Sequence, residues 1–309
     1  MSINVNQIKQ LRENTGAGMM DCRKALEEVS GDFNAAVDWL RTKGLAAAVK
    51  KSSRVVAEGL ICIITKGNKG CMVELNSETD FVARNEQFHK LLHTITNIAL
   101  DNNVHDVGQL KNIKYLDSGK TVQEVIADNI AVIGENMNLR RVAITEVTQG
   151  IMGHYIHNTI TESMGAIGVM IALESTSNRE ELNSLAEQLA MHVAATKPEV
   201  TSISEVNLKN IEQEKRIFME QAKASGKPTN VIEKMVEGRL RKYYEEVVLL
   251  EQTFVIDGKT KISDLLEKTS AKIGAPIKIT SFIKFVLGEG IKREESNFLE
   301  EVASMSNNI

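Results

Sequence analysis

The feature that most constrains the fold is a strand–turn–strand–helix pattern that occurs twice along the chain. GCMVEL at 70–75 matches GVMIAL at 168–173 in its Gly, Met and Leu. Each segment ends a predicted hairpin, and an amphipathic helix follows each hairpin, FHKLLHTITNIAL first and ELNSLAEQLAMHVAAT second. This repeat predicts an α+β fold with a two-lobed core, in which each lobe has a small antiparallel sheet with helices on one face.

The segments around this core read as helices. The apolar spacing within 4–44 predicts three short helices, a bundle that is marginal alone but can serve as a docking module. Residues 45–54, LAAAVKKSSR, read as a basic helical tail or linker. Residues 205–224 and 229–247 are too polar for buried helices, so we expect an inserted antiparallel helical hairpin that projects into solvent or pairs with a second copy. Turns within the first bundle are expected at Gly16, Gly18, Gly31 and Gly44.

The chain is closed by a predicted strand, KITSFIKFVLG at 278–288, and an amphipathic helix at 291–306. The domains predicted in this way are an N-terminal three-helix docking domain with its linker (1–54), core lobe 1 (55–147), the first part of core lobe 2 (148–204), the inserted helical hairpin (205–247), the completion of lobe 2 (248–290) and a C-terminal helical module (291–309).

Composition excludes several classes of protein. The net charge of −4 argues against a broad nucleic-acid surface, and the basic residues near 43–54 have no interleaved aromatic residues that could stack bases. No window of eighteen apolar residues predicts a membrane span, and the first residues resemble neither a secretion signal nor an Arg- and Ser-rich leader. Cys22, Cys62 and Cys71 form no CxxC pair, which favours packed, reduced thiols. We therefore expect a cytoplasmic protein that contacts neither membranes nor nucleic acid directly.

Motifs for catalysis are missing from the sequence. It contains no GxxxxGK[ST], GxGxxG or GxSxG. His89 and His93 share a helix face but lack the glutamate of HExxH, while His154 and His157 would point to opposite faces of a strand. The sequence therefore predicts a binding protein that is not an enzyme and needs no metal or cofactor.

One candidate binding residue is Phe81, which lies amid polar residues in NSETDFVARN at 76–85. Its ring could fold back onto the core of its own chain, or it could bind another protein. Ser77 and Asp80 have the spacing of a helix-start cap, which would fix the turn. Met19 and Met20 follow GAG in a loop, where flexible side chains could either adapt to a partner surface or pack within the three-helix domain.

Several stretches resemble one family. LRENTGAGMMDCRKALEEVSGDFNAAVDWLR closely resembles the N-terminal domain of bacterial elongation factor Ts, which is similar in fold to ubiquitin-associated domains, and TDFVARN at 79–85 matches the central motif of that family. The chain departs from the family in ATKP, where ASKP or ASRP is common, and in a longer loop at 157–165. The other motifs follow in the order of the family: IGENMNLRR at 133–141, MHVAATKP at 191–198, KMVEGRL at 234–240 and VLGEGI at 286–291.

The resemblance implies a nucleotide exchange factor that binds the GDP-bound form of elongation factor Tu and releases the GDP, with a possible homodimer through the hairpin. It implies that Phe81 inserts near the phosphate and Mg²⁺ site of the partner and that Asp80 contacts the same region. The alternative is a polypeptide-binding adaptor that uses the ubiquitin-associated-like N-terminal domain. The partner-binding residues implied by the family motifs are Arg12, Met19 and Met20 in the first domain, Thr79, Asp80, Phe81 and Val82 in the central motif, Ile133 and Gly134 beside it, and His157, Met235 and Val236 in the second lobe.

Overall fold

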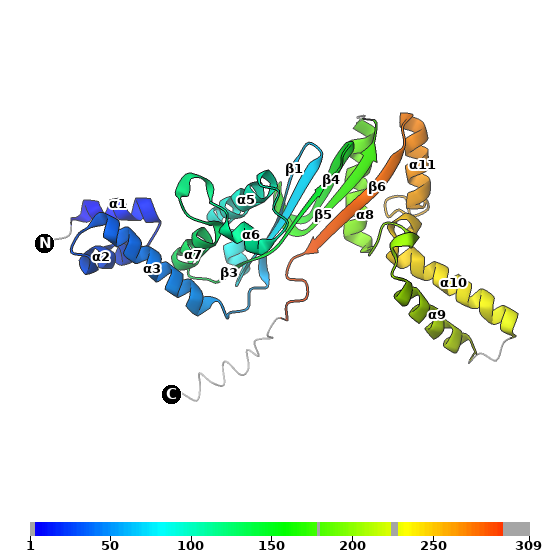
Figure 1. The fold of residues 1–309 in the computed structure, drawn as a ribbon, viewed down its shortest axis with the longest axis horizontal. Coiled ribbons are helices and arrows are strands. Elements are labelled where there is room, and N and C mark those ends of the chain that lie inside the picture. The colour runs from blue at the N-terminus through cyan, green and yellow to red at the C-terminus, as the bar shows by residue number, and fades with distance from the viewer. Residues whose placement is uncertain (1–3, 178–179, 224–227, 293–309) are drawn as a thin grey trace. The chain divides into compact units, whose positions relative to one another are not determined.

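The structure of the chain is a computed structural model that describes residues 4–177, 180–223 and 228–292. Its helices and strands are labelled in Figure 1. The helix predicted at 291–306 lies outside the described residues, apart from 291 and 292. Contacts between residues divide the described chain into two compact units, the first made of 4–62, 73–142 and 286–292 and the second of 63–72, 143–177, 180–223 and 228–285.

The first unit begins with α1 (Val5–Thr15), α2 (Met19–Glu28) and α3 (Phe33–Lys51). Asn4 caps α1 through a capping box with Gln7, and the Asp32 carboxylate caps α3 by accepting from the Ala35 N–H at 2.9 Å. The three helices share a small apolar cluster made of Ile8, Leu11, Cys22, Ala25, Leu26 and Ala36.

The prediction that the third helix ends in a turn at Gly44 is wrong, because α3 continues to Lys51 and includes most of the expected tail. Gly44 is buried where α3 packs on α7 (Val122–Ile133). A Cβ atom at Gly44 would lie 3.3 Å from the Cβ of Ala131. The glycine therefore allows a close helix–helix contact, at a propensity cost of about 1 kcal/mol relative to alanine.

The six strands form one sheet in the order β3-β2-β1-β5-β4, with β6 paired to β5, so the prediction of two separate small sheets is wrong. The cause is the length of β1, whose second half lies in the second unit and extends the ladder there: the Ile63 N–H donates to the Ser163 carbonyl at 3.0 Å. The α+β class and the hairpin at KGNKG are confirmed. The strands are β1 (Glu58–Lys66), β2 (Lys69–Ser77), β3 (Met137–Glu146), β4 (Gly150–Thr161), β5 (Met164–Ser175) and β6 (Ile277–Val286).

Helices complete the first unit. The predicted helix after β2 is α5 (Glu86–Asp101), whose buried face includes Phe88, Leu92 and Ile95. The remaining helical segments of this unit are α4 (Asp80–Ala83), α6 (Val107–Asn112), η1 (Leu116–Ser118) and α7.

A buried carboxylate fixes the VLGEGI segment to the first unit. Glu74 in β2 is fully buried and accepts from Arg140 Nη1, Arg141 Nε and the Gly288 N–H. Burial by itself raises the pKa of Glu74, but hydrogen bonds from the Gly288 N–H and the Asn76 amide, together with the Arg141 charge, outweigh burial and lower it. Glu74 is therefore ionised at neutral pH and joins β2, β3 and the segment after β6 within this unit.

In the second unit, α8 (Glu180–Thr196) packs directly on β4. A Cβ atom at Gly153 would lie 2.5 Å from the Cβ of Ala186, so glycine is required for this approach. Antiparallel pairing of β4 with β5 places Gly153 opposite Ile171, and the core beneath includes Leu189 and Phe254. The helices of this unit are α8 (Glu180–Thr196), η2 (Ile203–Glu205), α9 (Leu208–Lys223), α10 (Thr229–Val247), η3 (Leu249–Glu251) and α11 (Ile262–Ile273).

The two predicted polar helices, α9 and α10, pack against one another. Most of their side chains are exposed, and their contact is a short apolar seam. The seam consists of Ala222, Ile232 and Val236, with Phe218 and Met219 packed beside it.

Two further expectations concern the whole chain. All three cysteines lie in the described part of the chain, where they are buried and none forms a disulfide. Burial raises the pKa of the Cys22 thiol, which keeps it protonated.

Within the described ranges, no helix combines the length and apolar character that a bilayer crossing requires.

A buried histidine ties α8 to the segment that follows α10. The ring of His192 is fully buried, with Nε2 2.9 Å from Gln252 Oε1, while Nδ1 accepts from the Val255 N–H at 3.2 Å. Gln252 Nε2 in turn donates to the Glu246 carbonyl at 2.7 Å. An Nδ1 atom that accepts requires the neutral tautomer, and burial lowers the pKa of His192.

Stability should therefore fall in mild acid. Below about pH 6.5, His192 becomes protonated in the unfolded chain but stays neutral in the folded chain. For this residue the free energy of unfolding therefore drops by at most about 1.4 kcal/mol per pH unit. Burial also lowers the pKa of His154, which adds a change of the same sign. Urea unfolding at pH 7.5 and 5.5 measures the drop. His192→Gln should reduce it, and an equal drop in the variant would contradict this assignment.

Candidate partner-binding site

The turn after β2 presents a large apolar side chain to solvent. Phe81 is 81% exposed, although its neighbours Val82 and Ala83 are buried at 6% and 5%. The alternative that Phe81 packs in the core of its own chain is therefore wrong for this structure. The two buried residues anchor α4 from below, so the ring at the start of the helix points outward.

The turn is held by Glu135, which follows α7. The Thr79 N–H donates to Glu135 Oε2 at 3.0 Å, and Thr79 Oγ1 donates to Glu135 Oε1 at 2.8 Å. The predicted cap between Ser77 and Asp80 is wrong, because Thr79 is the N-cap residue of α4. Ser77 is buried and its hydroxyl donates to the Thr79 carbonyl at 2.9 Å, whereas exposed Asp80 pairs with Arg84 at 3.3 Å.

Neighbouring contacts fix the loop after α7 to the same turn. The Asn136 N–H donates to Glu78 Oε1 at 2.6 Å, and Asn136 Nδ2 donates to the Arg54 carbonyl at 3.0 Å. Lys51, the last residue of α3, donates to the Gly134 carbonyl. The end of α3, the end of α7 and the turn that carries Phe81 therefore meet at residues 134–136.

Gly134 has a specific backbone role in this loop. It ends α7 with φ +88°, and its N–H donates to the Ile130 carbonyl at 3.0 Å. A residue with a Cβ is strained in this left-handed conformation. Ile133, the other predicted residue of the loop, is half-buried, while Gly134 is exposed. The structure thus brings Thr79 and the 133–135 segment together, two residues before Phe81.

On the far side of the turn, the ring of His89 fixes the end of α4. Its Nε2 lies 2.7 Å from the Ala83 carbonyl, to which it donates. His93, which shares a helix face with His89, lies 3.2 Å from the Asn97 amide. Among the residues that the structure describes, no group of three or more His, Cys, Asp or Glu could hold a metal ion.

The predicted contacts of the three-helix domain are exposed. Met20 is 75% exposed and Met19 is 36% exposed at the start of α2, so the alternative that Met20 packs inside the domain is wrong. Arg12 is exposed in the last turn of α1. These three residues are accessible to a partner.

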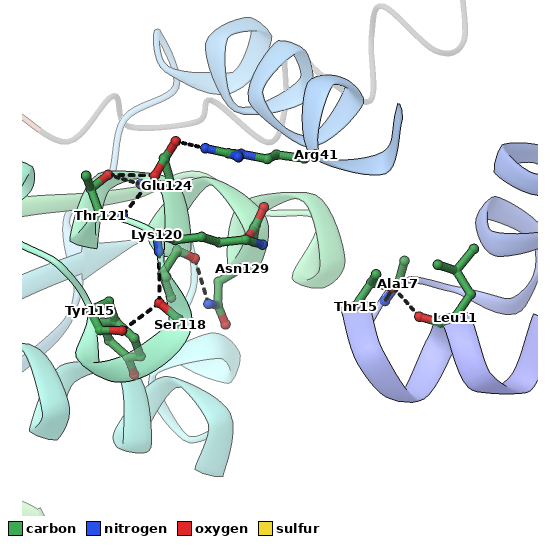
Figure 2. A network of polar contacts seen from close by, with 12 residues as sticks. Leu11, Thr15, Ala17, Arg41, Tyr115, Ser118, Lys120, Thr121, Glu124 and Asn129 are labelled. Atoms are coloured by element: carbon green, nitrogen blue, oxygen red, sulfur yellow. Dashed lines mark hydrogen bonds and ion pairs between the residues drawn. The ribbon is translucent and has the colours of Figure 1, made fainter. Parts of the chain in front are cut away.

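Polar contacts attach this domain to α7, as Figure 2 shows. Arg41 on α3 reaches the Glu124 carboxylate, which also accepts from the Thr121 N–H at 2.8 Å in a capping box. The Thr121 hydrogen bond and the Arg41 contact lower the pKa of Glu124. Lys120, which precedes α7, pairs with Asp128 of α7 at 2.6 Å. The sequence does not single out Arg41 and Glu124, because their contact joins segments 83 residues apart.

The second-unit residues have mixed environments. His157 on β4 is exposed, and its Nδ1 lies 3.2 Å from the Tyr155 hydroxyl. The expected long loop at 157–165 is largely strand, because β4 continues to Thr161 and β5 begins at Met164. Met235 is half-buried, and Val236 is 3% exposed in the seam between α9 and α10. The Val236 side chain therefore has little surface to offer a partner.

Comparison with known proteins identifies the family. The family model described as elongation factor TS matches residues 78–289, a range that begins beside the Phe81 turn. The chain belongs to this family. Membership assigns it to translation elongation in protein biosynthesis, and so to the elongation factors.

Individual relatives match over nearly the whole chain. Elongation factor Ts of Rhodospirillum centenum is 52% identical over 299 residues, which cover 97% of each chain. That of Rhodospirillum rubrum is 53% identical over 298 residues, or 96% of each chain. That of Rickettsia bellii is 48% identical over 306 residues, or 99% of this chain and 98% of the relative.

Two glycine substitutions should have opposite effects on stability. Gly134→Ala forces a Cβ into the left-handed conformation and should lower the free energy of unfolding by roughly 1–2 kcal/mol. Gly238→Ala lies within α10, where a Cβ has no described atom within 4 Å, and should raise it by roughly 0.5–1 kcal/mol. Urea unfolding of both variants measures the changes. A neutral Gly134→Ala would contradict the backbone role of this residue.

Proposed function

We propose that the chain binds elongation factor Tu in its GDP-bound form and promotes release of the GDP, without catalysing a chemical reaction and without a cofactor of its own. The observation that carries the proposal is the 81% exposed ring of Phe81. Thr79 before it is hydrogen-bonded to Glu135, and Val82 and Ala83 after it are buried. The ring inserts near the phosphate and Mg²⁺ region of the partner, and Asp80 contacts the same region. Membership of the elongation factor Ts family supports this assignment.

The free energy for release comes from contacts that form when the partner is distorted. Coupling between two ligands is reciprocal, so a factor that weakens GDP binding is itself weakened by GDP to the same degree. A contact that is equal in both forms of the partner shifts nothing. Burying the exposed ring provides roughly 1.5–3 kcal/mol, or about ten- to a hundredfold in the equilibrium.

Other surfaces supply the rest of the affinity. Exposed Arg12, Met19 and Met20 dock on the nucleotide-binding domain of the partner, where flexible methionines adapt to its surface. His157 and Met235 contact a further domain of the partner. The buried side chains of Val82 and Val236 support these contacts from within the chain. Pairing of α9 and α10 with a second copy would make a homodimer.

Removal of the ring should slow GDP release. Phe81→Ala should reduce the maximal rate of release from elongation factor Tu about ten- to a hundredfold, because the contact that favours the distorted partner is lost. Release of a fluorescent GDP analogue measures the rate, and urea unfolding checks that the exposed substitution leaves stability unchanged. An undiminished rate would refute the insertion of Phe81. Peptide binding with no effect of the parent chain on release would instead favour the adaptor.

Substitution in the docking surface should change affinity more than maximal rate. Met20→Ser removes an exposed apolar side chain that is distant in sequence from the Phe81 turn. The concentration of the chain that gives half-maximal release should rise several-fold, and the rate at saturation should stay within about twofold. A fall in the saturated rate with no change in half-maximal concentration would contradict docking by Met20.

A further inference from the structure

We infer that Glu135 is the positioning residue for Phe81, and this inference rests on the proposed function. Its carboxylate accepts both polar hydrogens of Thr79, the N–H at 3.0 Å and the hydroxyl at 2.8 Å. Thr79 lies two residues before Phe81 and is the N-cap residue of α4. Glu135 therefore fixes the point from which the helix that carries the ring begins.

The helix needs this external support because α4 is only four residues long. A single helical turn is unstable by itself, because its few hydrogen bonds do not offset the entropy lost when its backbone dihedral angles are fixed. The usual internal support would be an N-cap side chain that accepts from the first turn. The Thr79 hydroxyl donates to Glu135, and this hydrogen bond joins the start of α4 to the segment after α7. Hydrogen bonds to an ionised carboxylate are about twice as strong as neutral ones.

A third hydrogen bond fixes the register between the two segments. Glu78 Oε1 accepts from the Asn136 N–H at 2.6 Å, while Glu135 accepts from Thr79. Each segment thus contributes one carboxylate and one backbone N–H. Glu78 accepts from Asn136, and Glu135 accepts from Thr79. A shift of either segment by one residue would break both contacts.

This reciprocal pair gives the ring a mechanical support. When Phe81 pushes between elements of a partner, the partner pushes back on the turn. The contacts of Thr79 and Glu78 transmit that load to residues 134–136, where Lys51 of α3 also binds. Without Glu135 the backbone of the turn can move away from the partner. The Phe81 ring is then still present but no longer accelerates GDP release.

The chemistry of the contact predicts an order for substitutions at residue 135. Glu135→Gln keeps the length of the side chain and can keep both contacts. Its carbonyl oxygen can accept from the Thr79 N–H while its NH2 group donates to Thr79 Oγ1. Glu135→Asp is one methylene shorter and cannot reach both hydrogens. Glu135→Ala removes both hydrogen bonds. The order of maximal release rates should therefore be parent, Gln, Asp and then Ala, with Gln within about threefold of the parent.

A double-mutant cycle with Phe81→Ala tests the inference on the full chain. Glu135→Ala alone should lower the maximal rate of GDP release from elongation factor Tu about tenfold, with little change in half-maximal concentration. The double variant Phe81→Ala/Glu135→Ala should be no more than about twofold slower than Phe81→Ala, because without the ring there is nothing left to position. Effects that multiply independently would overturn the inference.

Further variants separate positioning from other roles. A Glu135→Gln variant as slow as Glu135→Ala would assign the effect to the negative charge and would also overturn it. Glu86→Ala removes an exposed carboxylate close in sequence to the turn and should leave the rate within about twofold of the parent. Failure of the parent chain to accelerate GDP release refutes the proposed function itself. Failure of Phe81→Ala to slow release refutes the insertion of Phe81, whereas independent effects in the cycle refute only the role of Glu135.

Discussion

The hydrogen bonds between Glu135 and Thr79 oppose the tendency of an apolar ring to leave water. Exposing a phenylalanine costs roughly 1.5–3 kcal/mol relative to burying it, so an unsupported turn would fold the ring inward. Here Val82 and Ala83 occupy the interior below α4, and Glu135 fixes the backbone before it. Phe81 lies at the surface, whereas the next two residues of the same helix are buried.

Within the first unit, one long helix lies between the proposed docking residues and this turn. Helix α3 packs against the small helices that carry Arg12, Met19 and Met20, and against α7 through Gly44 and Arg41. Its last residue, Lys51, reaches the carbonyl of Gly134. Helix α3 therefore contacts both α7 and the loop that follows it. The glycine in mid-helix thus has a packing role in place of the turn that its identity suggested.

Several sequence predictions were right because they depend on neighbours in the chain. The hairpin at KGNKG, the helices after each hairpin and the polar helical pair follow from local periodicity and turn residues. The candidate motif at 79–85 was also found from the sequence, where an aromatic residue amid polar ones stands out. The errors have a common cause. Local patterns alone predict a turn at Gly44 and a helix cap at Ser77, whereas contacts with α7 and Thr79 respectively determine the environments of these residues.

The sequence by itself determined the α+β class, most helices and strands, and the family, because periodicity and motif order are properties of the chain. The tertiary structure alone decided whether Phe81 lies inside or outside, what holds it there and how many sheets the strands make. Those outcomes depend on contacts such as Glu135 with Thr79, 56 residues apart, and Arg41 with Glu124, 83 residues apart. A carboxylate at position 135 looks like any solvated acid until folding places the two hydrogens of Thr79 against it.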